Sequence, residues 1–398
     1  MPLTSNYYDF VRHQRPYVLQ CAEADAQDIL AGSKPPSSVA TLDGHAGRYR
    51  ECLAQIDREV LGTLAEDTGE PVEVVRQQLD DPKMRSRLAA FHEVVAIEYR
   101  LLLNFFLAGR RTYRVADAIA ECFAYTEPQV PALLASLPAT TCLFVYTSPV
   151  VVNELHNISR PGVALDERAP DRDYSAPVSV FATITAVPGG RDKALSVTAW
   201  HARVPGQHYV LLQRELVLRA GQQLPDAIRS ALDPQQAARA GAAADTVAGI
   251  TVAARPSYAG GAGFLRIVLD SMLYLLSDRP DVRFAQSEKH DLEARAHSLS
   301  LDSRWNDAFG RAVRFSVLNY HDLGRTVAPL WPDRNRGTGS SGSSRPAPLP
   351  AAQRPAVVKG GWKVEGGGSD RDPRRLVFVR PTLRGGPKAF VPAPDRFK

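Results

Sequence analysis

The chain has 398 residues, 44% of them hydrophobic, and a net charge of +5, which suits one large domain or two. Its first residues lack the cationic start and apolar run of a signal peptide. The apolar run at residues 101–108 is far shorter than the about 20 residues that span a bilayer, so we expect a cytoplasmic protein with no membrane partner.

The first 139 residues are predicted to form a helical domain. Apolar residues recur at helical spacing in residues 44–67 and again in residues 84–108, which we expect to be the central helix. Shorter helices are predicted at residues 115–125 and 129–137.

Residues 140–332 are predicted to form an α+β core domain. A strand is expected at residues 141–153, where Pro149 places the second half at a sheet edge. Alternating apolar residues bounded by Gly and Pro then predict an antiparallel meander of three strands, at residues 177–187, 194–204 and 208–218.

Helices are predicted after the meander, at residues 224–232 and 264–277. The glycines at residues 260–263 are expected to form a flexible start to the second helix. Residues 309–320 fit a helix or a strand equally well.

The last part of the chain differs in composition from the rest. Residues 333–353 are rich in Gly, Ser and Pro and are predicted to be a flexible linker. Residues 354–398 form a basic C-terminal segment, with strands expected at 355–364 and 374–380. The predicted fold class is therefore α+β, with a helical N-terminal domain, a central antiparallel meander with helices, and a basic C-terminal β-ribbon after the linker.

The positive charge is concentrated in this last part. Residues 331–398 hold 14 Lys and Arg against 5 Asp and Glu, which gives +9, whereas the rest of the chain carries −4. A segment of this kind favours polyanionic partners such as RNA. A solubilising tail with no partner would have the same composition.

Cations and aromatic residues alternate in the basic C-terminal segment. Cations can neutralise phosphates while aromatic rings stack on bases, which predicts an RNA-binding or partner-binding surface. The residues of this predicted surface are Arg354, Lys359, Trp362, Lys363, Arg374, Arg375, Phe378, Arg380, Arg384 and Lys388. Alternatively, or in addition, Trp362 and Phe378 pack the ribbon onto the body of the protein.

Signals for catalysis are weak. The sequence has no phosphate-binding P-loop, no nucleophile elbow and no complete pair of zinc-binding histidines. Glu154 and His156 follow a predicted strand and are the weak catalytic candidates. The spacing of the four cysteines matches no zinc site, so neither a metal nor another cofactor is predicted, and no small-molecule substrate is evident. Binding is favoured over catalysis.

Several segments resemble the second type V-A anti-CRISPR family over roughly residues 140–398. In the basic C-terminal segment these are RPAVVKGGW at residues 354–362, RRLVFVRP at 374–381 and the terminal AFVP at 389–392. Upstream and in the same order they are ELVLRAGQQLPDAI at 215–228 and LYLLSDRPDV at 273–282. Where the family has two histidines, this chain has Ala356 and Gly361, while Lys359 keeps a positive charge.

The resemblance implies a mobile-element-encoded inhibitor that blocks production of the effector nuclease. Its partners would be the nascent effector-nuclease peptide, the ribosome or the mRNA. One alternative is a phage or plasmid nucleic-acid-binding accessory protein without anti-CRISPR activity. A second alternative is an RNA hydrolase that uses the region of Glu154 and His156.

Overall fold

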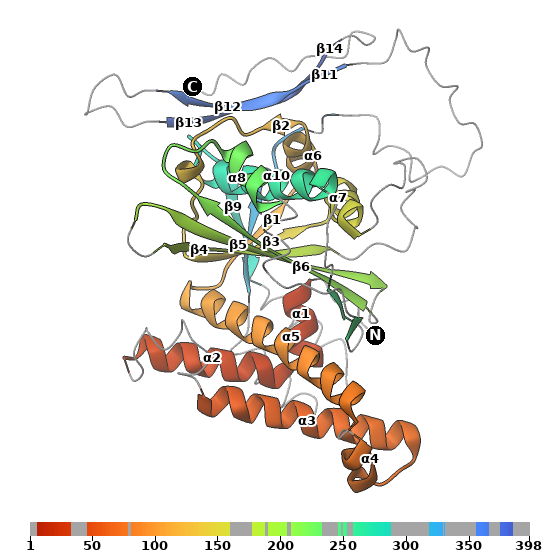
Figure 1. The fold of residues 1–398 in the computed structure, drawn as a ribbon. Coiled ribbons are helices and arrows are strands. Elements are labelled where there is room, and N and C mark those ends of the chain that lie inside the picture. Colours follow the sequence, from red (N-terminus) through yellow and green to blue (C-terminus); the bar gives the residue numbers. More distant parts are fainter. Residues whose placement is uncertain are drawn as a thin grey trace, which may run out of the picture.

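A computed structural model gives the fold shown in Figure 1. It describes the following residues: 6–32, 46–78, 81–159, 177–187, 190–204, 208–232, 246–247, 250–252, 258–287, 318–328, 330, 356–365 and 375–384. The described part is α+β and stacks in layers, with N-terminal helices at one end and the C-terminal ribbon at the other (Figure 1). The fold class predicted from the sequence is confirmed.

The N-terminal helices pack on one another and on one face of the sheet. Asn6 caps the first helix by accepting a hydrogen bond from the Asp9 backbone N–H at 3.0 Å, and Pro16 begins the second helix, where its missing N–H does no harm. The helices are α1 (Tyr7–Gln14), α2 (Pro16–Leu30), α3 (Ala46–Thr68), α4 (Val72–Gln78) and α5 (Pro82–Leu107). The central helix predicted from the sequence is α5, which contacts both α2 and the sheet.

Among the described residues, nine strands form one mixed sheet in the order β7-β8-β6-β5-β4-β3-β1-β10-β9. β1 lies between β3 and β10 and is parallel to both, while β3 to β6 run antiparallel in sequence. Their bounds are β1 (Arg111–Val115), β3 (Thr141–Tyr146), β4 (Val178–Ala186), β5 (Lys193–Val204), β6 (His208–Leu218), β7 (Thr246–Val247), β8 (Ile250–Val252), β9 (Val282–Ser287) and β10 (Asn319–Leu323). The predicted meander is confirmed as β4, β5 and β6.

Both faces of this sheet are covered, so its central strands are apolar on both sides. Two neighbouring residues of β3 show this. Val145 packs against the N-terminal helices, whereas Phe144 packs on the opposite face of the sheet. The second face is covered by α6 (Asp117–Ala124), α7 (Pro149–Ser159), α8 (Leu224–Ala231) and α10 (Tyr258–Leu275). A short 3-10 helix, η3 (Ala132–Leu134), joins α6 to β3 along the chain.

The C-terminal ribbon lies over α10 and α6, on the side of the helix layer away from the sheet (Figure 1). Its strands are β11 (Ala356–Val358), β12 (Gly360–Glu365), β13 (Arg375–Val379) and β14 (Thr382–Arg384), and β12 also pairs with β2 (Thr126–Glu127). A Cβ at Gly360 would lie 2.6 Å from Pro381 and 2.7 Å from the Val379 carbonyl oxygen, so only glycine fits where the ribbon turns back.

Four predictions from the sequence are wrong in detail. Instead of a helix at residues 129–137, the structure has only the short 3-10 helix η3. The segment 1–139 contains strand β1, because Arg111–Val115 gains parallel partners that lie elsewhere in the chain. The strand from residue 141 ends at Tyr146, and Pro149 begins helix α7 instead of continuing an edge strand. The glycines at 260–263 lie inside α10, and the lack of a side chain at Gly263 lets Glu154 of α7 approach closely.

Some predictions concern residues that the structure does not describe. The linker at 333–353 and most of the ambiguous segment at 309–320 lie outside the described residues, although β10 begins at Asn319. The division of the chain into domains stays a prediction. Within the described residues, no helix combines the length and hydropathy needed to cross a bilayer.

Candidate binding surface on the C-terminal ribbon

The ribbon is held to the body by Trp362. Its indole Nε1–H donates a hydrogen bond of 2.7 Å to the carboxylate of Asp270, on α10, and only 6% of the residue is exposed. Asp270 is fully buried, and burial raises the pKa of its carboxyl well above the usual value, although the Trp362 hydrogen bond and the charge of Arg266 act in the opposite direction. A polar contact in an apolar layer therefore fixes the position of β12.

Phe378 pairs with Trp362 across the ribbon and completes the apolar contact. The two ring centroids are 4.9 Å apart, and Phe378 also meets the edges of Phe123 and Tyr274 at 5.6 and 5.7 Å. The prediction that Trp362 and Phe378 offer open stacking faces to RNA is therefore corrected, since both rings pack inward against the helices. The alternative, in which they anchor the ribbon, agrees with these contacts.

The outer face of the ribbon carries exposed cations. Register pairs Lys363 with Val377 and Glu365 with Arg375, and these side chains alternate with the inward Trp362 and Phe378. Both Lys363 and Arg375 are exposed, and the Arg375 guanidinium lies 4.0 Å from the Asp278 carboxylate. The outer face is thus mixed in charge, with cations accessible to solvent.

Two further predicted cations lie at the margins of the ribbon and bind the body. Lys359 forms an ion pair with Glu127, just after α6, and the Arg380 guanidinium donates to the backbone carbonyl of Ala328. The hydrogen bond from Lys359 has the largest effect on the pKa of Glu127, and it lowers this pKa. These contacts give Lys359 and Arg380 a part in docking the ribbon.

The remaining residues of the predicted surface cannot be placed. Arg384 lies in β14, but its side chain is outside the described part of the chain. Arg354, Arg374 and Lys388 lie wholly outside the described residues. Their part in binding stays a prediction.

The weak catalytic candidates lie on α7 and not at a strand end. Glu154 faces α10, where its carboxylate lies so close to Gly263 that a Cβ there would clash with it. A carboxylate packed against a helix backbone is poorly placed to accept a proton from a substrate. The side chain of His156 is outside the described part of the chain, so its pairing with Glu154 stays a prediction.

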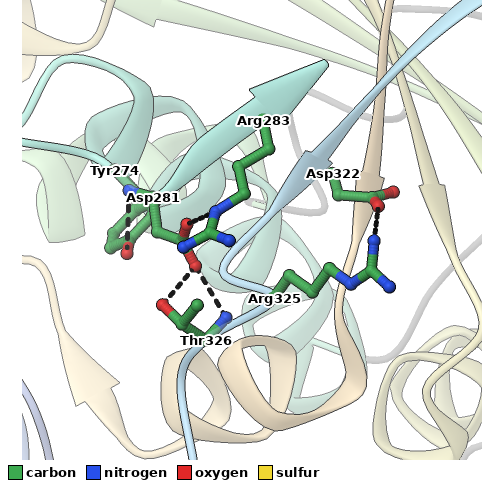
Figure 2. Close-up of polar contacts among 6 residues, drawn as sticks. All are labelled: Tyr274, Asp281, Arg283, Asp322, Arg325 and Thr326. Carbon is green, nitrogen blue, oxygen red and sulfur yellow. Dashed lines mark hydrogen bonds and ion pairs between the residues drawn. The ribbon is translucent and has the colours of Figure 1, made fainter. Parts of the chain in front are cut away.

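Asp281 was not singled out from the sequence, yet it joins three segments beside the ribbon. Its carboxylate accepts hydrogen bonds from the backbone N–H and hydroxyl of Thr326, at 2.7 and 2.6 Å, and from Arg283 Nε at 3.1 Å (Figure 2). Burial acts to raise the pKa of Asp281, but the Thr326 hydrogen bonds and the Arg283 charge outweigh it, so the pKa is lowered. The loop after β10 is thereby held against the end of α10.

Replacing Asp281 with alanine is expected to lower the free energy of unfolding by about 1–3 kcal/mol at pH 7, because donors on Thr326 lose their acceptor. A lowered pKa means that this contribution is present above the unfolded value of about 3.9 and is lost as the pH falls through the folded value. Urea unfolding at pH 7 and at low pH measures this, and the gap between wild type and variant should narrow at low pH.

Asp278→Ala is the matched control, since Asp278 lies on the same turn and its carboxylate reaches Arg375 only at 4.0 Å. It should change stability by less than about 1 kcal/mol. Equal losses for the two variants would contradict the role given to Asp281.

Those segments of the family resemblance that lie within the described residues converge around α10. The strand and helix at 215–228 contribute Leu216 and Ile228 to the same buried cluster as Leu273, Trp362 and Leu376. The Pro-Asp turn at the end of 273–282 includes Asp281, and the backbone N–H of Asp278 donates to the Leu376 carbonyl at 2.8 Å. Stretches far apart in sequence thus form one packed unit beneath the ribbon.

No group of three or more metal-ligating side chains occurs among the residues that the structure describes. The four cysteines lie within the described part as free thiols, and three of them are buried.

Known proteins offer only a weak structural match to this chain. No family model and no curated protein matches the chain. Among solved structures, the chain is similar to one described as "Crystal structure of AcrVA2", with a TM-score of 0.37, 11% sequence identity, and coverage of 95% of this chain and 98% of that chain. A TM-score of this size does not establish a common fold.

Proposed function

We propose that the protein is a binding protein, an inhibitor of the anti-CRISPR type, whose C-terminal ribbon contacts RNA through its outer face. The observation that carries the RNA contact is the two-sided ribbon: Trp362 is fixed inward by Asp270, which leaves Lys363 and Arg375 on the solvent side. The segment from residue 331 onward also has a charge of +9. The anti-CRISPR part comes from the sequence resemblance, and those of its segments that the structure describes pack together around α10.

Lys363→Glu is expected to weaken binding of single-stranded RNA and to make it less dependent on salt. Removal of one phosphate-neutralising cation should lower the slope of log K against log salt by about 0.7 for a single strand. Fluorescence anisotropy at several salt concentrations measures this, and Arg375→Glu should behave in the same way.

Arg58→Glu is the matched control, because Arg58 is an exposed arginine on α3, at the other end of the molecule from the ribbon (Figure 1). It makes the same change of charge and should leave the slope unaltered. The proposal that the ribbon binds RNA would be contradicted if RNA binding by the unmodified protein did not depend on salt. Equal effects of Lys363→Glu and Arg58→Glu would also contradict it.

Co-expression with a tagged type V-A effector nuclease tests the inhibitory part. We expect less nuclease protein and less of its message than in cells without the inhibitor, and recovery of the nascent nuclease peptide with the protein from translating cells. Unchanged levels together with RNA binding would favour the alternative of a nucleic-acid-binding accessory protein without anti-CRISPR activity.

A further inference from the structure

A cleft of about 330 Å³ lies at the carboxyl ends of β10, β1 and β3. These three strands are adjacent and parallel, and ligands of open α/β sheets bind outside the carboxyl ends of such strands. The lining includes Arg114 at the end of β1, Thr147 after β3, and Asp322 and Arg325 at the end of β10. The cleft uses none of the residues of the ribbon.

Two arginines in this cleft bind the carboxylate of Asp322. Arg114 brings Nε and Nη2 to 2.8 Å from Asp322 Oδ1, and Arg325 brings Nη1 to 3.3 Å from the other oxygen (Figure 2 shows the second pair). The Asp322 side chain is 13% exposed, whereas those of Arg114 and Arg325 are 49% and 69% exposed. Each guanidinium has five N–H donors, so donors remain beyond those that Asp322 engages.

Arg114 is held in position before any ligand arrives. Its guanidinium carbon lies 5.1 Å from the centre of the Tyr320 ring, and the Tyr320 hydroxyl accepts a hydrogen bond of 2.5 Å from the Asn6 amide. A guanidinium fixed by stacking loses less conformational entropy when it binds an anion.

The start of α6 adds a second feature that favours an anion, although the Asp117 carboxylate in its first turn offsets part of the positive charge. Its N-cap is Ala116, which lines the cleft, and no side chain caps this end of the helix. The N-terminal backbone N–H groups of a helix carry partial positive charge and bind phosphate readily. Asp117 in the first turn accepts a hydrogen bond of 2.7 Å from Thr147, which fixes the loop after β3 beside this helix end.

We propose that this cleft binds a phosphate monoester carried by a small molecule, through Arg114, Arg325 and the start of α6. The volume is at the lower end of the range of small-molecule sites and admits a phosphate with a modest organic group. Paired guanidiniums match the geometry of phosphate oxygens. Asp322 orients both arginines and also competes with the ligand for their donors.

Isothermal titration of the full chain with AMP, inorganic phosphate and adenosine tests this proposal at constant ionic strength. AMP should bind and adenosine should not, and the ratio of AMP to phosphate affinity tells whether the organic group contributes. Arg114→Gln and Arg325→Gln should each weaken binding about tenfold or more. Asp322→Asn should strengthen it, because the competing charge is removed.

Arg229→Gln is the control, since Arg229 is an exposed arginine on α8 paired with Asp226 and lies outside the lining of the cleft. Thermal unfolding without ligand shows whether each variant is folded. No binding of AMP or phosphate at millimolar concentration would overturn the proposal, as would equal affinities for folded Arg114→Gln and Arg229→Gln. If Lys363→Glu and Arg375→Glu lose RNA binding but still bind AMP, the cleft and the ribbon are separate sites.

Discussion

Trp362→Ala is expected to lower the free energy of unfolding by about 3–5 kcal/mol and to release the ribbon for proteolysis. The substitution empties the space beside Phe378 and removes the hydrogen-bond donor of a fully buried carboxylate, Asp270. Chemical denaturation measures the loss. Trypsin cleavage after Lys363 should accelerate, because the strand no longer stays paired with the body.

Two variants separate the ring from its hydrogen bond. Trp362→Phe keeps an aromatic ring but loses the N–H, so its loss of stability should be smaller than that of Trp362→Ala. Asp270→Asn keeps an acceptor for Trp362 and removes a group whose pKa is raised by burial. Unchanged trypsin sensitivity in Trp362→Ala would contradict the anchoring role.

The pH dependence of Asp270 follows from the direction of its shift. A raised folded pKa means that the favourable contribution of the protonated group is complete below the unfolded value of about 3.9 and is lost as the pH rises through the folded value. Asp270→Asn is therefore expected to be more stable than wild type at neutral pH, with a flatter stability profile above about pH 4.

Glu98→Ala is expected to destabilise the protein by about 3–5 kcal/mol, because it removes a buried carboxylate that both a guanidinium and a tyrosine hydroxyl contact. Glu98 is fully buried on α5, and Arg15 Nη1 lies 2.6 Å from its carboxylate. The hydroxyl of Tyr7 donates to the same group, and the Tyr7 ring stacks on Trp200 of the sheet at 3.9 Å. The contact therefore ties α1, α5 and the sheet together.

Urea unfolding measures this loss, with Asp226→Ala as the matched control. Asp226 pairs with Arg229 at 2.8 Å, but both side chains are largely exposed, so its removal should change stability by at most about 1 kcal/mol. Glu98→Gln, which keeps an acceptor of the same shape, should fall between the two. A loss for Glu98→Ala no larger than that of the control would show that the buried contact contributes little.

The meander and the main helices could be predicted from the sequence because their patterns are local. Strands β4 to β6 are short apolar-rich segments between clear turns, and α5 has an apolar stripe along its length. The short strands β1, β9 and β10 carry weak patterns, since their places depend on partners far along the chain. A five-residue parallel strand such as β1 is defined by its neighbours more than by its own residues.

The candidate site was predicted in part, for a similar reason. The cations and aromatic residues of the ribbon are visible in the sequence, but which of them face inward depends on the contact of Trp362 with Asp270, 92 residues apart. The cleft at the carboxyl ends of β10, β1 and β3 forms because Arg114 lies beside Asp322, which is 208 residues away in the sequence. Neither pairing leaves a motif, because no fixed spacing joins the residues.

The position of β10 has a consequence for how the protein is made. β1 pairs with β10, and Asn6 reaches Tyr320 across 314 residues, so the sheet cannot close until nearly all of its chain has left the ribosome. At about 5–20 residues per second, the 208 residues between Arg114 and Asp322 correspond to roughly 10–40 s of synthesis. During that time one edge of β1 is open to other chains. Expression yield should therefore be sensitive to the rate of translation.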